Sequence, residues 1–106
     1  MNICYYLYVS FSEESVDKAA TLYRALGNRL RLGILLLLED RPACVHELVE
    51  HTGASQPLVS QHLRVLKSVN AVRGVRLGKE MVYQIDDEHI AHIVREGIHH
   101  IEEKKA

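Results

Sequence analysis

Four side chains near the C-terminus carry the donor atoms that divalent metal ions prefer, namely those of Asp87, His89, His100 and Glu103. Their segment is expected to form the last helix of the chain. At 3.6 residues per turn, His89 and His100 share one helix face to within about 20°, but they lie roughly 16 Å apart along the axis. Because zinc–nitrogen and zinc–oxygen bonds are only about 2 Å long, one helix cannot bring both ends of this set to a single ion.

Two copies of this helix running antiparallel remove the conflict, because Asp87 and His89 of one copy then lie beside His100 and Glu103 of the other. The spacing therefore predicts a homodimer with two equivalent metal sites between the subunits, each with two nitrogen and two oxygen ligands. This donor set suits zinc or cobalt, and nickel would fit at a higher coordination number if His92 joined. The competing interpretation is a solvated, histidine-rich helix face that binds nothing.

The charge of the chain is unevenly distributed, although its formal value is only −1. Residues 51–79 contain no Asp or Glu, and five basic side chains lie among them. The rest of the chain is acidic. A local basic surface on an acidic body is typical of a protein that presents one face to an anion such as nucleic acid. The basic residues of this segment are Arg64, Lys67, Arg73, Arg76 and Lys79.

Length and composition indicate one domain, since the chain has 106 residues and is 47% hydrophobic. The two cysteines, Cys4 and Cys44, are too few for a disulfide framework. The apolar N-terminus lacks a basic leading region and a cleavage site, and the apolar run 30–38 is far shorter than the roughly 20 residues of a membrane span. We therefore expect a soluble cytoplasmic protein with reduced thiols.

Apolar periodicity predicts a mainly α fold with a small β-hairpin, in which 1–11 form an N-terminal tail and 12–106 the domain. The helix over 28–38 is apolar nearly all round, which predicts a central, buried position. The expected helices are 12–26, 28–38, 43–51 and 55–68, followed by strands 72–77 and 81–85 around Gly78-Lys79 and a last helix from Asp86-Asp87.

The order of helix, three-residue turn, helix and basic hairpin is that of a winged helix-turn-helix. Along the helix over 55–68 and just after it, Leu58, Val59, Leu63, Leu66 and Val69 are expected to pack inward. His62 is expected to be a packing or backbone-bonding residue and not a base reader. The outward side chains have the chemistry to read base edges and contact phosphates. The predicted DNA-binding residues are Ser55, Gln56, Ser60, Gln61, Arg64, Lys67, Arg73, Arg76 and Lys79. The alternative is an ordinary solvated helix face and a charged hairpin.

Four segments together resemble the ArsR/SmtB family of metal-sensing winged-helix repressors: 25–31, 44–48, 56–63 and 87–103. The resemblance covers about residues 15 to 103. It implies a homodimer joined through its first and last helices, which binds an inverted-repeat operator in double-stranded DNA and is released when metal binds. Asp87, His89, His100 and Glu103 match the last-helix ligands of zinc-responsive members, so the resemblance implies zinc as the effector.

The resemblance also points to a second metal site around Cys44, because many members place a thiolate at the start of the third helix. The candidate ligands are Cys44, His46, Glu47 and the tail residue Cys4. His46 replaces the second cysteine of the usual pair, which argues against sensing of arsenic, lead or cadmium. The competing interpretation is that Cys44 is a small buried hydrophobe.

The proposed sites are separate, so metal would act on DNA binding allosterically. A rival prediction is a repressor of the same fold that senses thiol oxidation or another metal through Cys44. A second rival is a metal-storage protein that does not bind DNA. An enzyme is not expected, because four protein ligands leave no coordination position for a reacting water.

Overall fold

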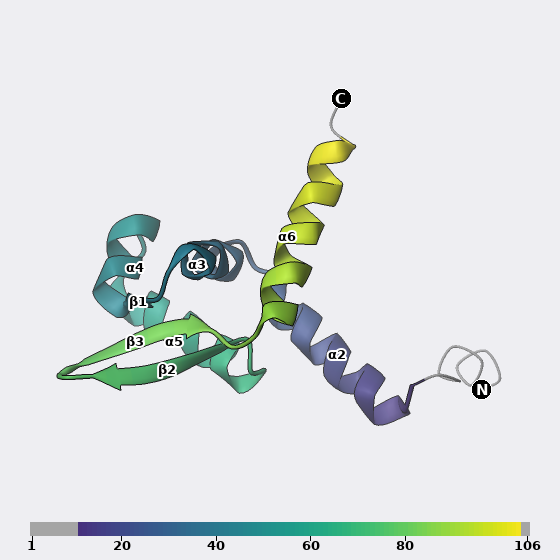
Figure 1. The fold of residues 1–106 in the computed structure, drawn as a ribbon, viewed down its shortest axis with the longest axis horizontal. Coiled ribbons are helices and arrows are strands. Elements are labelled where there is room, and N and C mark those ends of the chain that lie inside the picture. The colour runs from purple at the N-terminus through teal and green to yellow at the C-terminus, as the bar shows by residue number, and fades with distance from the viewer. Residues whose placement is uncertain (1–10, 105–106) are drawn as a thin grey trace.

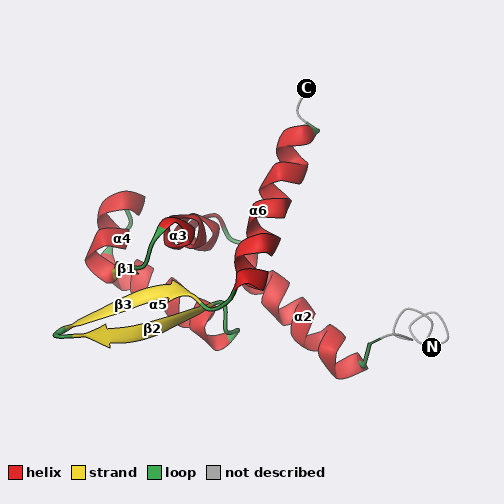
Figure 2. Cartoon of the chain, in the orientation of Figure 1, coloured by secondary structure: helices red, strands yellow, loops and turns green. Residues whose placement is uncertain are grey.

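The structure is a computed structural model that describes residues 11–104. Within them the chain forms five helices and three strands (Figures 1 and 2). Cys4 and nearly all of the predicted tail lie outside the described residues, so the predicted boundary between tail and domain stays a prediction. The elements are α2 (Glu13–Leu26), α3 (Arg29–Asp40), β1 (Ala43–Cys44), α4 (Val45–Thr52), α5 (Gln56–Ser68), β2 (Val72–Leu77), β3 (Glu80–Ile85) and α6 (Glu88–Glu103).

Four of the helices begin where a short polar side chain caps them, and this is why their starts could be predicted. In each case the side-chain oxygen accepts a hydrogen bond from the backbone N–H three residues later, which satisfies a donor that has no partner inside the helix. The capping residues are Ser12 of α2, Asn28 of α3, Ser55 of α5 and Asp87 of α6.

The sheet is larger than the predicted hairpin. The β2–β3 hairpin is confirmed, but residues 43–44, expected at the start of a helix, instead form β1 and pair antiparallel with β3. The strand order in the described residues is β1-β3-β2. Cys44 has the extended backbone of a helix N-cap, and this conformation also suits sheet pairing. Two residues are too few to form an alternating pattern, so β1 could not be predicted from the residues alone.

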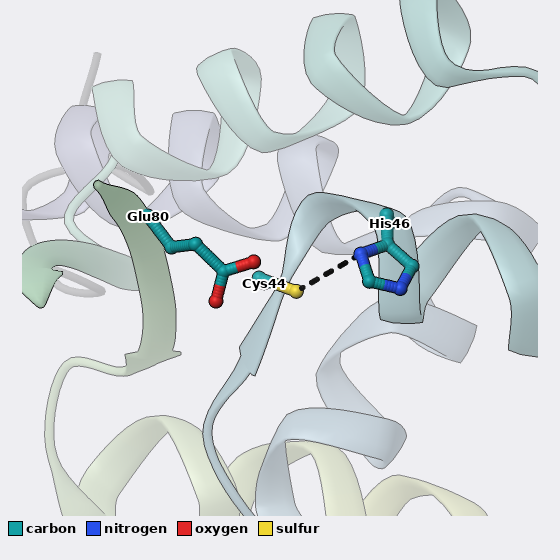
Figure 3. A group of neighbouring side chains, drawn as sticks. All are labelled: Cys44, His46 and Glu80. Carbon is teal, nitrogen blue, oxygen red and sulfur yellow. Dashed lines mark hydrogen bonds between the residues drawn. The ribbon is translucent and has the colours of Figure 1, made fainter. Parts of the chain in front are cut away.

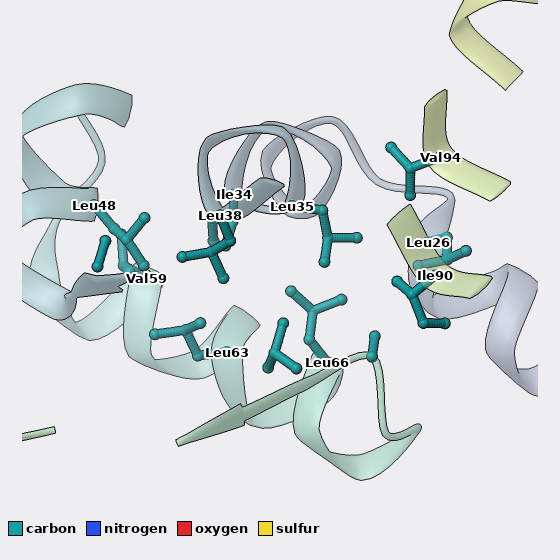
Figure 4. Close-up of a cluster of buried hydrophobic side chains, with 13 residues drawn as sticks. Leu26, Ile34, Leu35, Leu38, Leu48, Val59, Leu63, Leu66, Ile90 and Val94 are labelled. Atoms are coloured by element: carbon teal, nitrogen blue, oxygen red, sulfur yellow. The ribbon is translucent and has the colours of Figure 1, made fainter. Parts of the chain in front are cut away.

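The core forms around α3, as expected. Ile34, Leu35 and Leu38 of α3 pack against residues of α4, α5 and α6 (Figure 4). Fully burying such a side chain stabilises the fold by roughly 1.5–3 kcal/mol. The partners from the other helices include Leu48, Val59, Leu63, Leu66, Ile90 and Val94.

Two leucines depart from the predicted burial. Leu58 is 40% exposed and Leu36 is 42% exposed. Leu58 lies one residue before Val59, hence about 100° away around α5 from the buried stripe of Val59, Leu63 and Leu66. Leu36 has the same relation to Leu35 on α3. The expectation that Leu58 packs inward was therefore wrong, whereas the predicted central position of α3 is confirmed even though Leu36 on this helix is exposed.

The hairpin and the terminal helices lie on opposite sides of the body. Figure 1 shows the β2–β3 hairpin projecting to one side, with α2 and α6 meeting on the other. A salt bridge holds α6 against α3, because Arg95 Nε donates to Glu39 Oε1 at 2.7 Å. Among residues 11–104, every helix is too short or too polar to cross a lipid bilayer.

Candidate functional site

The outer face of α5 forms the first part of a possible DNA-binding surface. Gln56, Gln61, Arg64 and Lys67 are exposed there, and Ser60 is half-buried. The turn before α5 contains Gly53, whose φ of 76° is a left-handed conformation that favours glycine. This turn sets α5 against α4 in the helix-turn-helix arrangement. Ser55 is exposed, and its hydroxyl oxygen accepts the Leu58 N–H at 3.3 Å.

The hairpin carries the second part of this surface. Arg73, Arg76 and Lys79 are all exposed, at the positions expected from the sequence. The turn at its tip contains Gly78, with φ of 63°. A flexible basic side chain at such a tip can neutralise phosphates without reading bases. The structure thus places the predicted basic residues on two exposed elements, and their contact with DNA stays a prediction.

Arg31 joins the recognition helix α5 to the α2–α3 junction. Its Nε donates to the Ala25 carbonyl oxygen at 2.5 Å, and its Nη1 lies 3.0 Å from His62 Nδ1. Guanidinium groups only donate, so Nδ1 of His62 must accept and carries no proton. Partial burial, and secondarily the Arg31 charge, lower the pKa of His62 below its usual value. His62 was expected to pack or to bond to the backbone; it is half-buried, and its bond is to the Arg31 side chain instead of the backbone.

The last-helix residues occupy opposite ends of α6. Asp87 and His89 lie together at its start, with Asp87 Oδ1 3.7 Å from His89 Nδ1. His100 and Glu103 are exposed in its last turns. Asp87 Oδ1 also accepts the Ile90 N–H at 3.1 Å, so the helix cap fixes the carboxylate in place. One chain therefore presents two separate pairs of candidate ligands, and both their metal binding and their union across two chains stay predictions.

A second group of possible metal donors, closer together than those of α6, lies where β1, α4 and β3 meet. The ligand atoms of Cys44, His46 and Glu80 all lie within 4.8 Å of one another, and within residues 11–104 no other three His, Cys, Asp or Glu side chains do so (Figure 3). Cys44 is buried, and its Sγ is 3.7 Å from His46 Nδ1. Sequence reasoning missed Glu80, because the β1–β3 pairing that brings it here was not predicted.

Glu47, which the sequence suggested as a ligand here, has a different contact. Its Oε1 accepts the Cys44 N–H at 2.9 Å, as the third helical residue does in a capping box. This hydrogen bond is the main cause that lowers the pKa of the Glu47 carboxyl. Glu47 thus holds the backbone of Cys44, and Cys4 lies outside the described residues.

The fold and these surfaces define a winged helix-turn-helix regulator, and comparison with known proteins identifies its family. Residues 28–73 match the bacterial regulatory proteins of the arsR family. The chain is 40% identical over 91 residues to the HTH-type transcriptional regulator NmtR of Mycobacterium tuberculosis, covering 86% of this chain and 75% of that protein. This chain therefore belongs to the ArsR family of transcriptional regulators, and the predictions of this family and of a non-enzymatic protein are confirmed.

Two further relatives bear on assembly and length. The HTH-type transcriptional repressor SmtB of M. tuberculosis is 46% identical over 87 residues, which are 82% of this chain but only 64% of that protein. A homodimeric winged helix-turn-helix domain from Mycobacterium bovis has a TM-score of 0.83 at 29% identity, covering 88% of this chain and 86% of that one. The predicted winged helix-turn-helix fold is confirmed by this structural match.

Proposed function

We propose that this chain is a cytoplasmic metal-responsive repressor that binds an inverted-repeat operator as a homodimer. Zinc or cobalt, bound between the last helices of two subunits, would release it from DNA. The observation that carries this proposal is the division of Asp87 and His89 from His100 and Glu103 at the two ends of one helix. Its similarity to the transcriptional repressor SmtB and the transcriptional regulator NmtR supports the proposal that the chain is a repressor.

The exposed apolar residues of the terminal helices support a dimer seam. Tyr23 on α2 is 56% exposed, and Ile101 on α6 is 65% exposed. Ile101 directly follows His100 and lies about 100° from it around α6, so a partner helix that covers Ile101 would run beside the face that carries His100. The M. bovis domain is described as homodimeric, which supports the same assembly here.

DNA binding is supported by the chemistry of two exposed elements. The first turns of α5 offer amides and hydroxyls for base edges, and Arg64 and Lys67 follow on the same helix. The hairpin adds Arg73, Arg76 and Lys79, whose phosphate contacts would make affinity depend on salt concentration. A homodimer would present two such helices to successive major grooves of an inverted repeat.

A short run of backbone hydrogen bonds offers a route from the metal to α5. Asp87 follows Asp86, whose N–H donates to the Ala71 carbonyl oxygen at 3.0 Å. The N–H of Ala71 in turn donates to the Leu66 carbonyl oxygen of α5 at 2.9 Å. A displacement of the ligand Asp87 would thus act on the end of the recognition helix through two bonds. Coupling of this kind is typically worth about 1–3 kcal/mol, or 5–150-fold in affinity.

The test is a fluorescence-anisotropy titration on a labelled inverted-repeat duplex, selected in vitro from randomised duplexes by the metal-free protein. Zinc should weaken binding of the wild-type protein by about 5–150-fold. It should have no effect on His100→Ala, which loses a ligand. His99→Ala is the matched control, because the neighbouring side chain lies about 80° from His89 around the helix and should leave the response intact.

Other outcomes separate the rival functions. A zinc response that survives His100→Ala but is lost in Cys44→Ser would place metal sensing at Cys44. This second candidate function is favoured by the grouping of Cys44, His46 and Glu80. A response to oxidant alone, again lost in Cys44→Ser, would indicate a thiol sensor. Failure to enrich any duplex, with metal still bound, would indicate a storage protein and overturn the proposal.

A further inference from the structure

We propose that Arg31 is a positioning residue for operator recognition, because it fixes the rotation of α5 through its bond to His62 and does not itself contact DNA. This inference rests on the proposed function, since it presupposes an operator that α5 reads. It concerns the metal-free protein, which is the form proposed to bind DNA. It gives a role to a basic residue that lies outside the charged segment 51–79.

Arg31 is committed to bonds within the protein. It is half-buried in the first turn of α3, and its Nε donates to the carbonyl oxygen of Ala25 in the last turn of α2. The neighbouring carbonyls of that turn accept from the backbone N–H groups of Gly27 and Asn28, which leaves the Ala25 carbonyl to Arg31. A second donor of the same guanidinium, Nη1, lies 3.0 Å from His62 Nδ1, so one planar group joins α2, α3 and α5.

His62 lies where such a bond can set the orientation of α5. It is the middle residue of this helix, and in sequence it stands between the outward-facing Gln61 and Arg64. The apolar contacts of α5 restrict its position with little directional preference, whereas a hydrogen bond is directional. Within residues 11–104, the Arg31–His62 bond is the one side-chain hydrogen bond that joins α5 to another helix. Its loss would leave the rotation of α5 about its own axis less fixed.

Polar bonds thus hold α5 at two successive turns. The carbonyl oxygen of Leu66, four residues after His62, accepts the Ala71 N–H at 2.9 Å. That bond belongs to the route proposed above from Asp87, whereas the Arg31 bond leads to α2, a helix of the proposed dimer seam. Arg31 would therefore supply the fixed point against which a shift at the Leu66 end turns the helix.

The surroundings of His62 favour the neutral imidazole, which is the form that can accept from Arg31. A shallow pocket beside it is also lined by Arg29 of α3 and His51 of α4, and no carboxylate of residues 11–104 lines it. The elements α2 and β2, which also pack on α5, contribute no residue to this pocket. Partial burial and the Arg31 charge lower the pKa of His62, so the bond is intact at neutral pH.

The experiment measures the affinity of the metal-free protein for its in vitro selected duplex and for a scrambled duplex of the same length. The ratio of the two dissociation constants, obtained by fluorescence anisotropy, reports how well α5 reads base edges. Arg31→Lys keeps the charge, but one ammonium group cannot replace the fork that bonds both Ala25 and His62. This variant should lower the ratio by about tenfold, the effect of weakening one base contact. Arg29→Lys, the same substitution at an exposed position of the same turn, is the matched control and should leave the ratio unchanged.

The salt dependence of binding separates a positioning residue from a phosphate contact. Arg31→Met removes the charge and keeps an unbranched apolar side chain. For a positioning residue, the slope of the logarithm of affinity against the logarithm of salt concentration should stay that of the wild type. Loss of a phosphate contact would make this slope shallower by about 0.9. A shallower slope with an unchanged ratio would overturn the proposal, because Arg31 would then contact DNA.

Variants of His62 test the bond from its other end. His62→Phe keeps an aromatic ring but removes the acceptor, so it should reproduce the loss of specificity. His62→Asn offers an amide oxygen to Arg31 and should restore most of the ratio. Circular dichroism checks that each variant is folded.

Two results would count against the proposal in different ways. Folded Arg31→Lys and His62→Phe variants with wild-type ratios would overturn it, because the bond would then only stabilise the fold. A wild-type protein that does not discriminate between the two duplexes would overturn the proposed function, and this inference would fall with it.

Discussion

The two candidate metal sites differ in how many chains they need. The α6 ligands lie at opposite ends of an exposed helix, so one chain holds two incomplete halves. Cys44, His46 and Glu80 are already together in one chain. Metal affinity at the first site must therefore depend on protein concentration, whereas affinity at the second must not. The first site can report on the geometry of a dimer, and the second on the conformation of its own subunit.

The largest expected effect comes from weakening the seam. Ile101→Glu places a charge on an exposed apolar position of α6, so folding of the subunit should be unaffected. Loss of this apolar contact, at about 1.5–3 kcal/mol per side chain, should raise the dimer dissociation constant at least tenfold. Sedimentation equilibrium measures this constant. Zinc affinity at the α6 site should fall as the dimer dissociates, and metal binding at Cys44 should not change. If metal binding at Cys44 weakened in parallel, the contrast between the two sites would be wrong.

Asp87 allows the helix cap and the metal ligand to be separated. Asp87→Ala should cost about 1 kcal/mol of unfolding free energy, because the Ile90 N–H loses its acceptor. Asp87→Asn should retain this stability, since asparagine caps as well as aspartate. Both variants should lose zinc-driven release from DNA. Denaturant unfolding and operator anisotropy test the two expectations separately, and a normal zinc response in Asp87→Asn would remove Asp87 from the ligand set.

A smaller effect is expected where α6 rests on α3. The Arg95–Glu39 salt bridge is partly exposed, so Arg95→Ala should lower the unfolding free energy by no more than about 1 kcal/mol. Because α6 would be held less firmly, zinc should release the variant less steeply from DNA. Cobalt binding at Cys44 should stay the same. Arg95→Lys serves as the control that keeps the charge, and a change in cobalt binding at Cys44 would show that the two sites are linked.

The smallest effect concerns His62, which belongs to neither site. Its pKa is lowered in the folded protein, so the unfolded chain takes up the proton first as pH falls. Stability from this group should be complete at pH values above the ordinary histidine pKa of 6.5 and should decline as pH falls below it. His62→Asn keeps an acceptor for Arg31 but does not titrate there. The free energies of unfolding of the wild type and His62→Asn, measured in the presence of a chelator, should diverge as the pH falls. Parallel curves of this free energy against pH would contradict the bond between His62 and Arg31.

Local geometry made much of this molecule predictable. The caps at Ser12, Asn28, Ser55 and Asp87 act within three residues, so the sequence alone located the helix starts. The fixed rotation per residue likewise placed His89 and His100 on one face of α6. Whether a partner completes that face depends on a second chain, which no local pattern contains.

Glu80 and Leu58 illustrate what local patterns miss. Glu80 joins Cys44 only because residues 43–44 pair with residues 82–83, a contact between distant segments that a two-residue strand does not announce. Leu58 is apolar but lies off the buried stripe of α5, so its residue type overstated its burial. The deciding factor for Glu80 was the tertiary position of β1, whereas for Leu58 it was the rotation per residue along α5.

The strand order β1-β3-β2 has one more consequence, for solubility. Within the described residues β2 is an edge strand, with one row of backbone groups free to pair with another chain. Val75 and Leu77 on this strand are exposed, a composition that promotes aggregation. Arg73 and Arg76 interrupt them with positive charges, which repel a second copy of the same edge. The side chains proposed to attract DNA thus also protect the hairpin from self-association.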